Sequence, residues 1–277
     1  AIYGSHGDAP RVVLSPKNVE DCFYLAIEAV RIARAYSTPV LLLTDQALSS
    51  RIEAFDEPDL PKLMIDAKVD RSERSADFKP YPLDRVTRHA PAGSRIASGK
   101  YPTVTGLEHD ELGHPTGSPK LHAQMNAKRR EKIKALAATL PAPEHSGEAE
   151  GDVLLVTWGS NWGPRREALA RVQAAGIKGG HMHIRHVHPL PNGLEAVFAR
   201  YRKIVVAELN DEGVYGFGQL AMMLRARIAN PAIVSVGKTD GLTFKVSELI
   251  AGVARHIGHA ALLESVGTAR PSPLAAR

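Results

Sequence analysis

The second half of the chain alternates short apolar runs with segments in which apolar residues recur at helical spacing. The apolar runs cover residues 153–158, 181–187, 204–209 and 233–236, and the helical segments cover residues 164–174, 193–201, 217–228 and 246–257. Four consecutive β-then-α units are typical of a parallel, doubly wound sheet with right-handed crossovers. We therefore expect an α/β domain over residues 151–264, followed by a loose tail over residues 265–277.

The first 55 residues contain the same two kinds of segment, but only one of each. Ser15 and Pro16 are typical of a helix start, because Ser is a common N-cap and Pro is tolerated in the first turn. Apolar residues then recur at helical spacing as far as Ala35. After a break, residues 40–44 form a continuous apolar run, which predicts a strand buried on both faces of a parallel sheet. Residues 1–55 are therefore expected to be the remainder of another α/β domain.

Residues 56–150 are expected to form an extended connection that contains one helix. Prolines recur over residues 56–104, and a loop of this length usually wraps a partner or carries a site. The helix is expected to start at Ser118, with its apolar side chains toward a core and the basic run of residues 128–130 toward water. Its core residues are expected to be Leu121, Met125, Ile133, Leu136 and Leu140. Residues 141–150, rich in Pro, Glu and Gly, are expected to be a linker.

Composition and charge argue against several classes of protein. Lys plus Arg exceed Asp plus Glu by 35 − 30 = 5, a small excess that gives little reason to expect nucleic acid or a membrane as a partner. No apolar run approaches the ~20 residues that a membrane-spanning helix needs. The single cysteine, Cys22, excludes an internal disulfide and an iron–sulfur cluster held by this chain alone. Because Cys22 lies on the apolar face of the first expected helix, we expect a buried, unreactive thiol.

The chain opens at Ala1 with neither a basic segment nor an apolar signal core. The first residues resemble the middle of a domain. Two explanations remain open, namely removal of an initiator Met before Ala1 and a processed or truncated chain that lacks an N-terminal part.

Four closely spaced histidines, His181, His183, His186 and His188, at first suggest a metal site. On a strand the first two share one face and the last two share the other, so the four side chains do not converge. We therefore expect no metal site, although histidines at the end of a strand could face a cleft.

Residues 158–164 join an expected strand to the start of a helix and contain two glycines. Free N–H groups at such a helix start could bind an anion. The sequence is not the GxGxxG fingerprint, and no acidic residue lies at the distance that a ribose site requires. We therefore favour a tight turn that needs glycine.

Polar residues follow the strand expected at residues 204–209. Open α/β sheets bind ligands outside the carboxyl ends of their strands. Asn210, Asp211 and Gln219 lie in such a position and are candidate ligand-binding residues. Capping of the next helix by Asn210 or Asp211 is an equally open alternative.

Two further groups of candidates lie in the first half of the chain. Arg11, which follows His6 and precedes the first expected helix, could grip a carboxylate with two parallel hydrogen bonds, as recognition of a keto acid would require. The second group is Thr105, Gly106, Glu108, His109 and Asp110, in the long loop. The alternatives are a solvated surface arginine and an ordinary turn.

Several stretches together resemble one family. In chain order they are YGSHGDAPRVVLSP, EAVRIARAYSTPVLLLTD, VTGLEHDELGHPT, VTWGSN, HPLP and ELN…GQL…LR. They cover the chain from Tyr3 to about Ala254, and they are similar to the alpha subunits of the 2-oxoacid:ferredoxin oxidoreductases, above all the 2-oxoglutarate type (2-oxoglutarate synthase).

This resemblance implies a fold and a set of partners. Residues 1–55 would be the C-terminal part of a thiamine pyrimidine-binding-type domain, and residues 151–264 a transketolase C-terminal-like domain. The acidic residue that engages the aminopyrimidine is then expected upstream of Ala1. A beta subunit would hold thiamine diphosphate, Mg²⁺ and a [4Fe–4S] cluster. A second alpha/beta unit, ferredoxin as electron carrier and a cytoplasmic location are also implied.

The implied reaction interconverts 2-oxoglutarate plus coenzyme A with succinyl-CoA plus CO₂, and exchanges electrons with ferredoxin. The resemblance implies that Arg11 binds the substrate carboxylate. It also implies that residues 105–110 and residues 210–219 line the entry or the coenzyme A side. The open alternatives are pyruvate or a branched-chain 2-oxoacid as substrate, a different thiamine enzyme such as a branched-chain dehydrogenase beta subunit, and a noncatalytic scaffold subunit.

Overall fold

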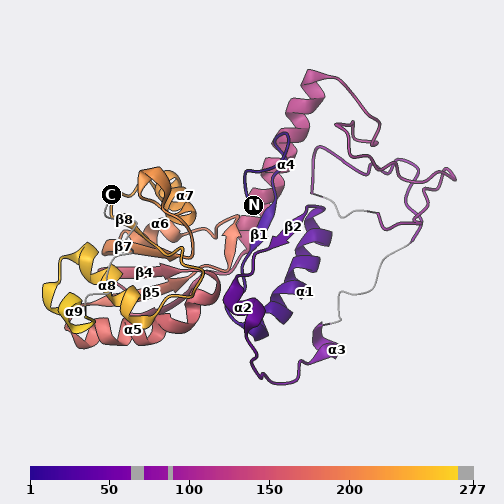
Figure 1. Ribbon diagram of the computed structural model, residues 1–277. Coiled ribbons are helices and arrows are strands. Elements are labelled where there is room, and N and C mark those ends of the chain that lie inside the picture. The colour runs from indigo at the N-terminus through magenta and orange to yellow at the C-terminus, as the bar shows by residue number, and fades with distance from the viewer. Residues whose placement is uncertain (64–71, 87–89, 268–277) are drawn as a thin grey trace. The chain divides into compact units, whose positions relative to one another are not determined.

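The computed structural model of the chain describes residues 1–63, 72–86 and 90–267 (Figure 1). It divides into two compact units. The first unit consists of Ala1–Leu14, Phe23–Leu42 and Ala54–Leu140, and the second of Ser15–Cys22, Leu43–Glu53 and Pro141–Arg277. Most of the tail expected over residues 265–277 lies outside the described residues. None of the described helices combines the length and the apolar character that crossing a bilayer requires.

The first unit contains two parallel strands, β1 (Val12–Leu14) and β2 (Val40–Leu42), joined by helix α1 (Val19–Tyr36). Val13 pairs with Leu41 at the centre of the two-strand ladder. The sequence pattern predicts the helix and the strand that follows it, whereas strand β1 is an additional element that it does not predict.

Helix α1 starts later than expected, at Val19. The Ser15 side chain does not cap it, because the hydroxyl donates to the carbonyl oxygen of Leu43 at 3.0 Å. The side chain of Asn18 accepts a hydrogen bond from the backbone N–H of Asp21 at 2.9 Å and supplies the cap.

Strand β2 is not buried on both faces, and this expectation is wrong for the chain as described. Val40 and Leu41 are half-buried, and Leu42 is 40% exposed. The physical reason is that β2 is an edge strand that pairs with β1 alone among the described strands.

Helix α4 (Pro119–Thr139) confirms the expected start, since the Ser118 hydroxyl accepts a hydrogen bond from the N–H of Leu121 at 3.4 Å. The helix packs with α1 and β1 around one apolar cluster. This cluster comprises Val12, Leu14, Leu25, Ala29, Ile32, Ile133 and Leu136. The basic run of α4 does not all face water, because Lys128 and Arg129 are half-buried and only Arg130 is exposed.

The described part of the chain between α3 (Leu60–Leu63) and α4 contains no regular helix or strand of its own. It is ordered by scattered backbone hydrogen bonds. The N–H of Arg74 donates to the oxygen of Arg95 at 2.7 Å, and the N–H of Tyr81 donates to the oxygen of Glu111 at 3.0 Å.

The second unit is a five-stranded sheet in the order β3-β5-β4-β7-β8. The strands are β3 (Glu144–Gly147), β4 (Gly151–Thr157), β5 (Gly179–His183), β7 (Tyr201–Glu208) and β8 (Ile233–Gly237). The last four are mutually parallel, which confirms the expected parallel sheet, whereas β3 is antiparallel to β5. The sheet is therefore mixed at this edge, and residues 141–150 are not simply a linker.

Two other expected elements differ from the structure. The strand expected over residues 181–187 is broken after His183, and a separate strand β6 covers His186–His188. The helix expected over residues 193–201 is the shorter α6 (Leu194–Phe198), because Tyr201 already begins β7.

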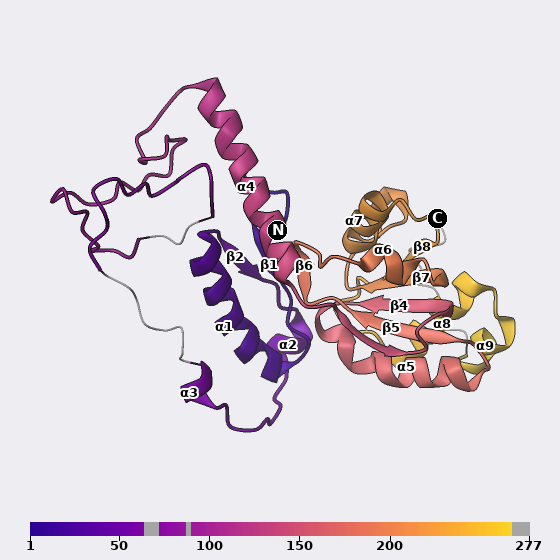
Figure 2. The same cartoon turned by 180° about the vertical axis from the view of Figure 1, so that it is seen from behind.

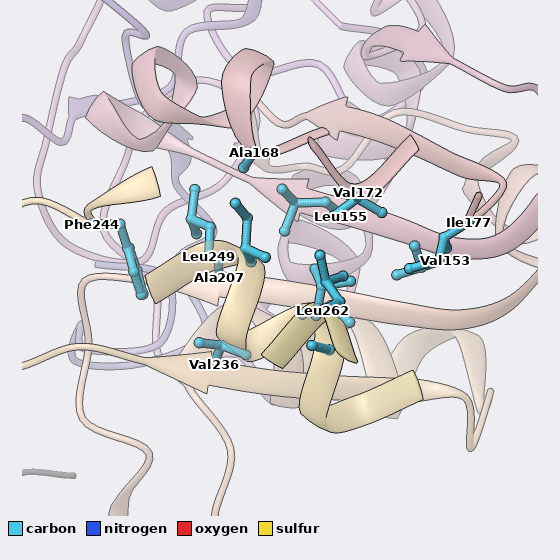
Figure 3. Close-up of a cluster of buried hydrophobic side chains, with 14 residues drawn as sticks. Val153, Leu155, Ala168, Val172, Ile177, Ala207, Val236, Phe244, Leu249 and Leu262 are labelled. Carbon is cyan, nitrogen blue, oxygen red and sulfur yellow. The ribbon is translucent and has the colours of Figure 1, made fainter. Parts of the chain in front are cut away.

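Helices cover both faces of this sheet, as Figures 1 and 2 show. On one face α5 (Trp162–Ala174), α8 (Val246–Ile257) and α9 (Ala260–Ser265) pack on a shared apolar cluster (Figure 3). Val153 and Leu155 of the sheet meet Ala168 and Leu249 of the helices in this cluster. α6 and α7 (Gln219–Ile228) lie on the other face, so the sheet is doubly wound.

Candidate functional site

The segment before β1 carries the first two candidate residues. His6 is exposed and lies in a turn in which the Ser5 hydroxyl donates to the oxygen of Ala9 at 3.2 Å. Arg11 is half-buried and directly precedes β1. The strand therefore fixes the backbone next to Arg11, while the grip of Arg11 on a substrate carboxylate stays a prediction.

The 105–110 loop is anchored on α4 through Glu108. The Glu108 carboxylate accepts hydrogen bonds from Arg129 Nη1 and Nη2 at 3.3 and 2.9 Å, and it also bonds His122 Nδ1. The bond from Arg129 lowers the pKa of Glu108 to about 2, with His122 acting in the same direction and burial opposing both. A carboxylate whose negative charge is compensated in this way holds its loop on the helix and is a poor proton acceptor.

The hydrogen bonds around His122 hold its ring in place. Arg129 Nη2 donates to Asn126 Oδ1 at 2.5 Å, which turns the Asn126 Nδ2 donor toward His122 Nε2 at 3.1 Å. His122 Nε2 is therefore the acceptor, and Nδ1 carries the hydrogen that bonds Glu108. The imidazole links the loop carboxylate to the side-chain network of α4.

The other loop candidates make local contacts. The Thr105 hydroxyl accepts the N–H of Leu107 at 3.2 Å. Asp110 Oδ1 accepts the N–H groups of Leu112 and His114, both at 2.9 Å. These are the turn contacts that the alternative interpretation predicts. The remaining two are His109, whose ring stacks on Tyr81 at 3.9 Å, and the exposed Gly106.

The second unit contains a cavity of about 330 Å³. Its lining includes the charged side chains of Lys17, Asp21, Glu144 and Arg185, together with His183 and three prolines. Arg185 Nε and Nη2 bond the two oxygens of Asp21 at 2.9 and 2.6 Å, which is a bidentate pair. The cavity wall is therefore charged, but the charges of Arg185 and Asp21 in it compensate each other.

Glu144 is the centre of this charged wall. Its carboxylate accepts bonds from Lys17 Nζ at 2.6 Å, Arg165 Nη2 at 2.6 Å and Trp162 Nε1 at 3.0 Å. Burial raises the pKa of Glu144, but these donors and the charges of Lys17 and Arg165 outweigh it and lower the pKa to about 2. Both cations also stack on the Trp162 ring, with centroid distances of 4.9 and 4.5 Å.

The first two histidines of the His-rich stretch share one partner. His181 Nε2 and His183 Nδ1 lie 2.8 and 2.9 Å from Thr157 Oγ1. Burial lowers the pKa of both, that of His183 to about 3, so both rings are neutral near pH 7. Within the described ranges, no group of three His, Cys, Asp or Glu side chains is arranged to hold a metal ion.

The residues after β7 are positioned by Glu208, which the sequence analysis missed. Its fully buried carboxylate accepts the N–H groups of Leu220 and Ala221, each at 2.8 Å, at the start of α7. Burial raises the pKa of Glu208. Glu208 therefore makes the helix cap that was offered as a role for Asn210 or Asp211. An acidic residue that ends an otherwise apolar strand is the signal that could have identified it.

The three candidates of this segment have different surroundings. Asn210 Nδ2 donates to Glu208 at 3.1 Å, Asp211 Oδ1 accepts the N–H of Gly213 at 2.6 Å, and Gln219 is exposed. Asn210 and Asp211 thus support the local backbone, and ligand binding by all three stays a prediction.

The turn after β4 is the tight turn that the sequence favours. Gly159 has φ +62°, a conformation that glycine adopts without strain. The N–H of Ser160 donates to Asp45 Oδ2 at 3.0 Å, so a carboxylate of the chain itself occupies the place proposed for an anion.

Cys22 is half-buried and has no disulfide partner. Burial, followed by the charges of Asp21 and Asp45, raises the pKa of its thiol, which agrees with the expected low reactivity.

Two family models match the chain. Residues 2–128 match "Pyruvate flavodoxin/ferredoxin oxidoreductase, thiamine diP-bdg", and residues 151–249 match "Pyruvate:ferredoxin oxidoreductase core domain II". The two matches cover both units of the structure.

Curated relatives match over most of the chain. The 2-oxoglutarate oxidoreductase subunit KorA of Mycobacterium tuberculosis is 36% identical over 90% of this chain. The 2-oxoacid:ferredoxin oxidoreductase 2 subunit alpha of Aeropyrum pernix is 32% identical over 92% of it. The chain spans only 37% and 39% of the length of these two relatives.

A solved structure of 2-oxoglutarate:ferredoxin oxidoreductase from Magnetococcus marinus, with 2-oxoglutarate, coenzyme A and succinyl-CoA bound, is also similar. The identity is 31% and the TM-score 0.80, over 93% of this chain and 44% of that chain.

Proposed function

Because the chain belongs to the alpha-subunit family of the 2-oxoacid:ferredoxin oxidoreductases, we propose that it is part of an enzyme that interconverts 2-oxoglutarate plus coenzyme A with succinyl-CoA plus CO₂. The observation that carries the proposal is the similarity, over 93% of this chain, to the Magnetococcus marinus enzyme with 2-oxoglutarate, coenzyme A and succinyl-CoA bound. Ferredoxin is the proposed electron carrier. The chain spans under half of that relative, so activity is proposed for the complete enzyme.

The proposed cofactors are thiamine diphosphate, Mg²⁺ and a [4Fe–4S] cluster. The chain has one cysteine, whereas such a cluster needs several thiolates. The described residues also contain no group of three candidate metal ligands. The single cysteine therefore does not fit the cluster, and the described residues do not fit the metal. We propose that a partner beta subunit holds the cofactors in a complex with a second alpha/beta unit.

The role proposed for this chain is to bind and orient substrate. Arg11 is proposed for the 2-oxoacid carboxylate, because a guanidinium can donate two parallel hydrogen bonds to it. His6 and the 105–110 loop are proposed to line the entry. Asn210, Asp211 and Gln219 are proposed for the coenzyme A side.

A second candidate substrate has a specific observation in its favour. The descriptions of both matching family models name pyruvate and not 2-oxoglutarate. Pyruvate lacks the second carboxylate, so the two substrates differ in one anionic group that the protein must bind or reject.

The test uses the complete enzyme that contains this chain, assayed for coenzyme A-dependent reduction of ferredoxin with 2-oxoglutarate, pyruvate and a branched-chain 2-oxoacid. We expect 2-oxoglutarate to give the highest kcat/KM and Arg11→Ala to lower it by about 10²-fold, mainly through KM, because a charged hydrogen bond is lost. Arg34→Ala, an exposed arginine at the end of α1, is the matched control. Unchanged turnover in Arg11→Ala would remove the role of Arg11, and a preference for pyruvate would overturn the proposed substrate.

A further inference from the structure

Helix α4 is strongly cationic, with six Lys or Arg side chains and Glu131 as its one acidic side chain. The four cations that are exposed or paired with a carboxylate are Lys120, Arg129, Arg130 and Lys134. Lys128 and Lys132 differ from these, because both are half-buried and neither is paired with a carboxylate of the described chain.

The two lysines occupy one face of α4. They are four residues apart, so their side chains leave the helix one turn apart on the same side. Lys132 Nζ donates to the carbonyl oxygen of Ser37, just after α1, at 2.8 Å, and this bond holds one ammonium group in place. Lys128 Nζ forms no hydrogen bond and no ion pair with any residue in the described ranges.

The acidic side chains that act electrostatically on Lys128 are already engaged. Glu111 and Asp84 are the carboxylates that act electrostatically on Lys128. Glu111 bonds Lys79 Nζ at 2.8 Å, and Asp84 pairs with Arg85 at 2.8 Å. Arg85 also acts on Lys128 with its positive charge. The site therefore has an excess of positive charge that the described chain does not compensate.

Burial and the neighbouring positive charges act in the same direction on both ammonium groups. Burial, followed by the charge of Lys132, lowers the pKa of Lys128 to about 8. Burial, followed by the charge of Arg129, lowers the pKa of Lys132 to about 8. A bound anion would offset both effects, because it restores opposite charge beside two partly desolvated cations.

We propose that Lys128 and Lys132 form a binding site for a phosphate group. Two adjacent lysines call for about two negative charges, which a phosphomonoester carries near pH 7. Lysine binds phosphate as a point charge and needs no fixed planar geometry. The phosphate can come from the 3′-phosphate of coenzyme A, a source that rests on the proposed function, or from free phosphate, which does not.

The first test probes phosphate binding without turnover. The complete enzyme is pulse-labelled with an amine-reactive reagent at pH 8, with and without inorganic phosphate, and each lysine is quantified by mass spectrometry. About half of Lys128 is unprotonated at this pH, so it should react faster than the exposed Lys120 and Lys134. We expect phosphate to slow labelling of Lys128 and Lys132 several-fold and to leave the two controls unchanged. Absence of protection, or unreactive lysines before phosphate is added, overturns the proposal.

The second test identifies the source of the phosphate. KM is compared for coenzyme A and for dephospho-coenzyme A, which lacks the 3′-phosphate, in wild type, Lys128→Gln and the control Lys134→Gln. In Lys128→Gln we expect the ratio of KM for dephospho-coenzyme A to KM for coenzyme A to fall about ten-fold. We expect kcat and the KM for dephospho-coenzyme A to stay unchanged. If the preference for coenzyme A over dephospho-coenzyme A is unchanged but phosphate still protects the two lysines from labelling, the site binds free phosphate. Coenzyme A is then excluded as the source of the phosphate. An enzyme that uses no coenzyme A refutes the proposed function, while the labelling result still decides the site.

Discussion

The sheet of the second unit and the described part of the segment between α3 and α4 in the first unit are ordered in opposite ways. In the sheet, backbone ladders align strands whose large side chains, such as Ile204 and Ile233, are fully buried. In the segment, Val104 and Leu107 are 68% and 67% exposed. Order there comes from isolated polar bonds, above all those that join Glu108 to α4.

The two regions obtain their stability from different sources. Burying one large aliphatic side chain stabilises a fold by about 1.5–3 kcal/mol, whereas one ordinary hydrogen bond contributes about 0.5–1.5 kcal/mol. The sheet therefore has many independent sources of stability. The segment depends on a few anchors, so it opens more readily and can adjust to a molecule that contacts it.

The largest expected effect comes from breaking the apolar cluster of the second unit. Leu249→Ala removes a side chain that is 1% exposed and leaves a cavity between α8 and the sheet, which should cost about 2–5 kcal/mol of the free energy of unfolding. Urea unfolding followed by tryptophan fluorescence measures this, because both tryptophans, Trp158 and Trp162, lie in the second unit. Leu242→Ala, at a position that is 63% exposed, is the control and should change stability by less than about 0.5 kcal/mol. Equal effects of the two variants would contradict the comparison.

A smaller effect is expected from the main polar anchor of the second unit. Glu144→Gln keeps the side-chain shape but leaves Arg165, whose side chain is 7% exposed, without its carboxylate. Because Glu144 is itself partly exposed and screened by solvent, we expect a loss of about 1–3 kcal/mol in the same unfolding measurement. Glu150→Gln, an exposed acid just before β4, should be close to neutral. A loss as large as that of Leu249→Ala would mean that polar bonds rival apolar burial in this unit.

Local sequence patterns predict the parts of the fold that local physics determines. Helix α8 covers the predicted Val246–Ile257, and Ser118 caps α4 as expected, because apolar spacing and cap chemistry act within one helix. The parallel strands are found because a strand covered by helices on both faces needs a nearly continuous apolar run.

What the sequence could not predict depends on partners far along the chain. The run EHSG at residues 144–147 has no strand pattern, and it becomes β3 because the edge of β5 pairs with it. Glu144 is the centre of a cluster whose other members are Lys17, Trp162 and Arg165. No local spacing reveals a contact over such separations. Arg129 of the basic run is likewise turned from water by Glu108.

The smallest expected effect tests the anchor of the extended segment through its pH dependence. The pKa of Glu108 is lowered from 4.5 to about 2, so its bonds stabilise the folded segment above pH 4.5. This contribution is lost as the pH falls through the range from about 4.5 to 2. Glu108→Gln should lose about 1–2 kcal/mol of local stability near pH 7 and should show a flatter acid response than wild type.

Hydrogen exchange of the amides of Leu107 and His114 in the complete enzyme measures this local stability, because both amides are bonded within the anchored segment. Glu131→Gln, which alters only an exposed i,i+3 pair with Lys134 on the same helix, is the matched control and should leave exchange unchanged. If exchange in Glu108→Gln equals wild type at pH 7, Glu108 is no anchor, and the segment must obtain its order from elsewhere. If instead the variant also loosens the second unit, the two regions share one source of stability and the contrast between them fails.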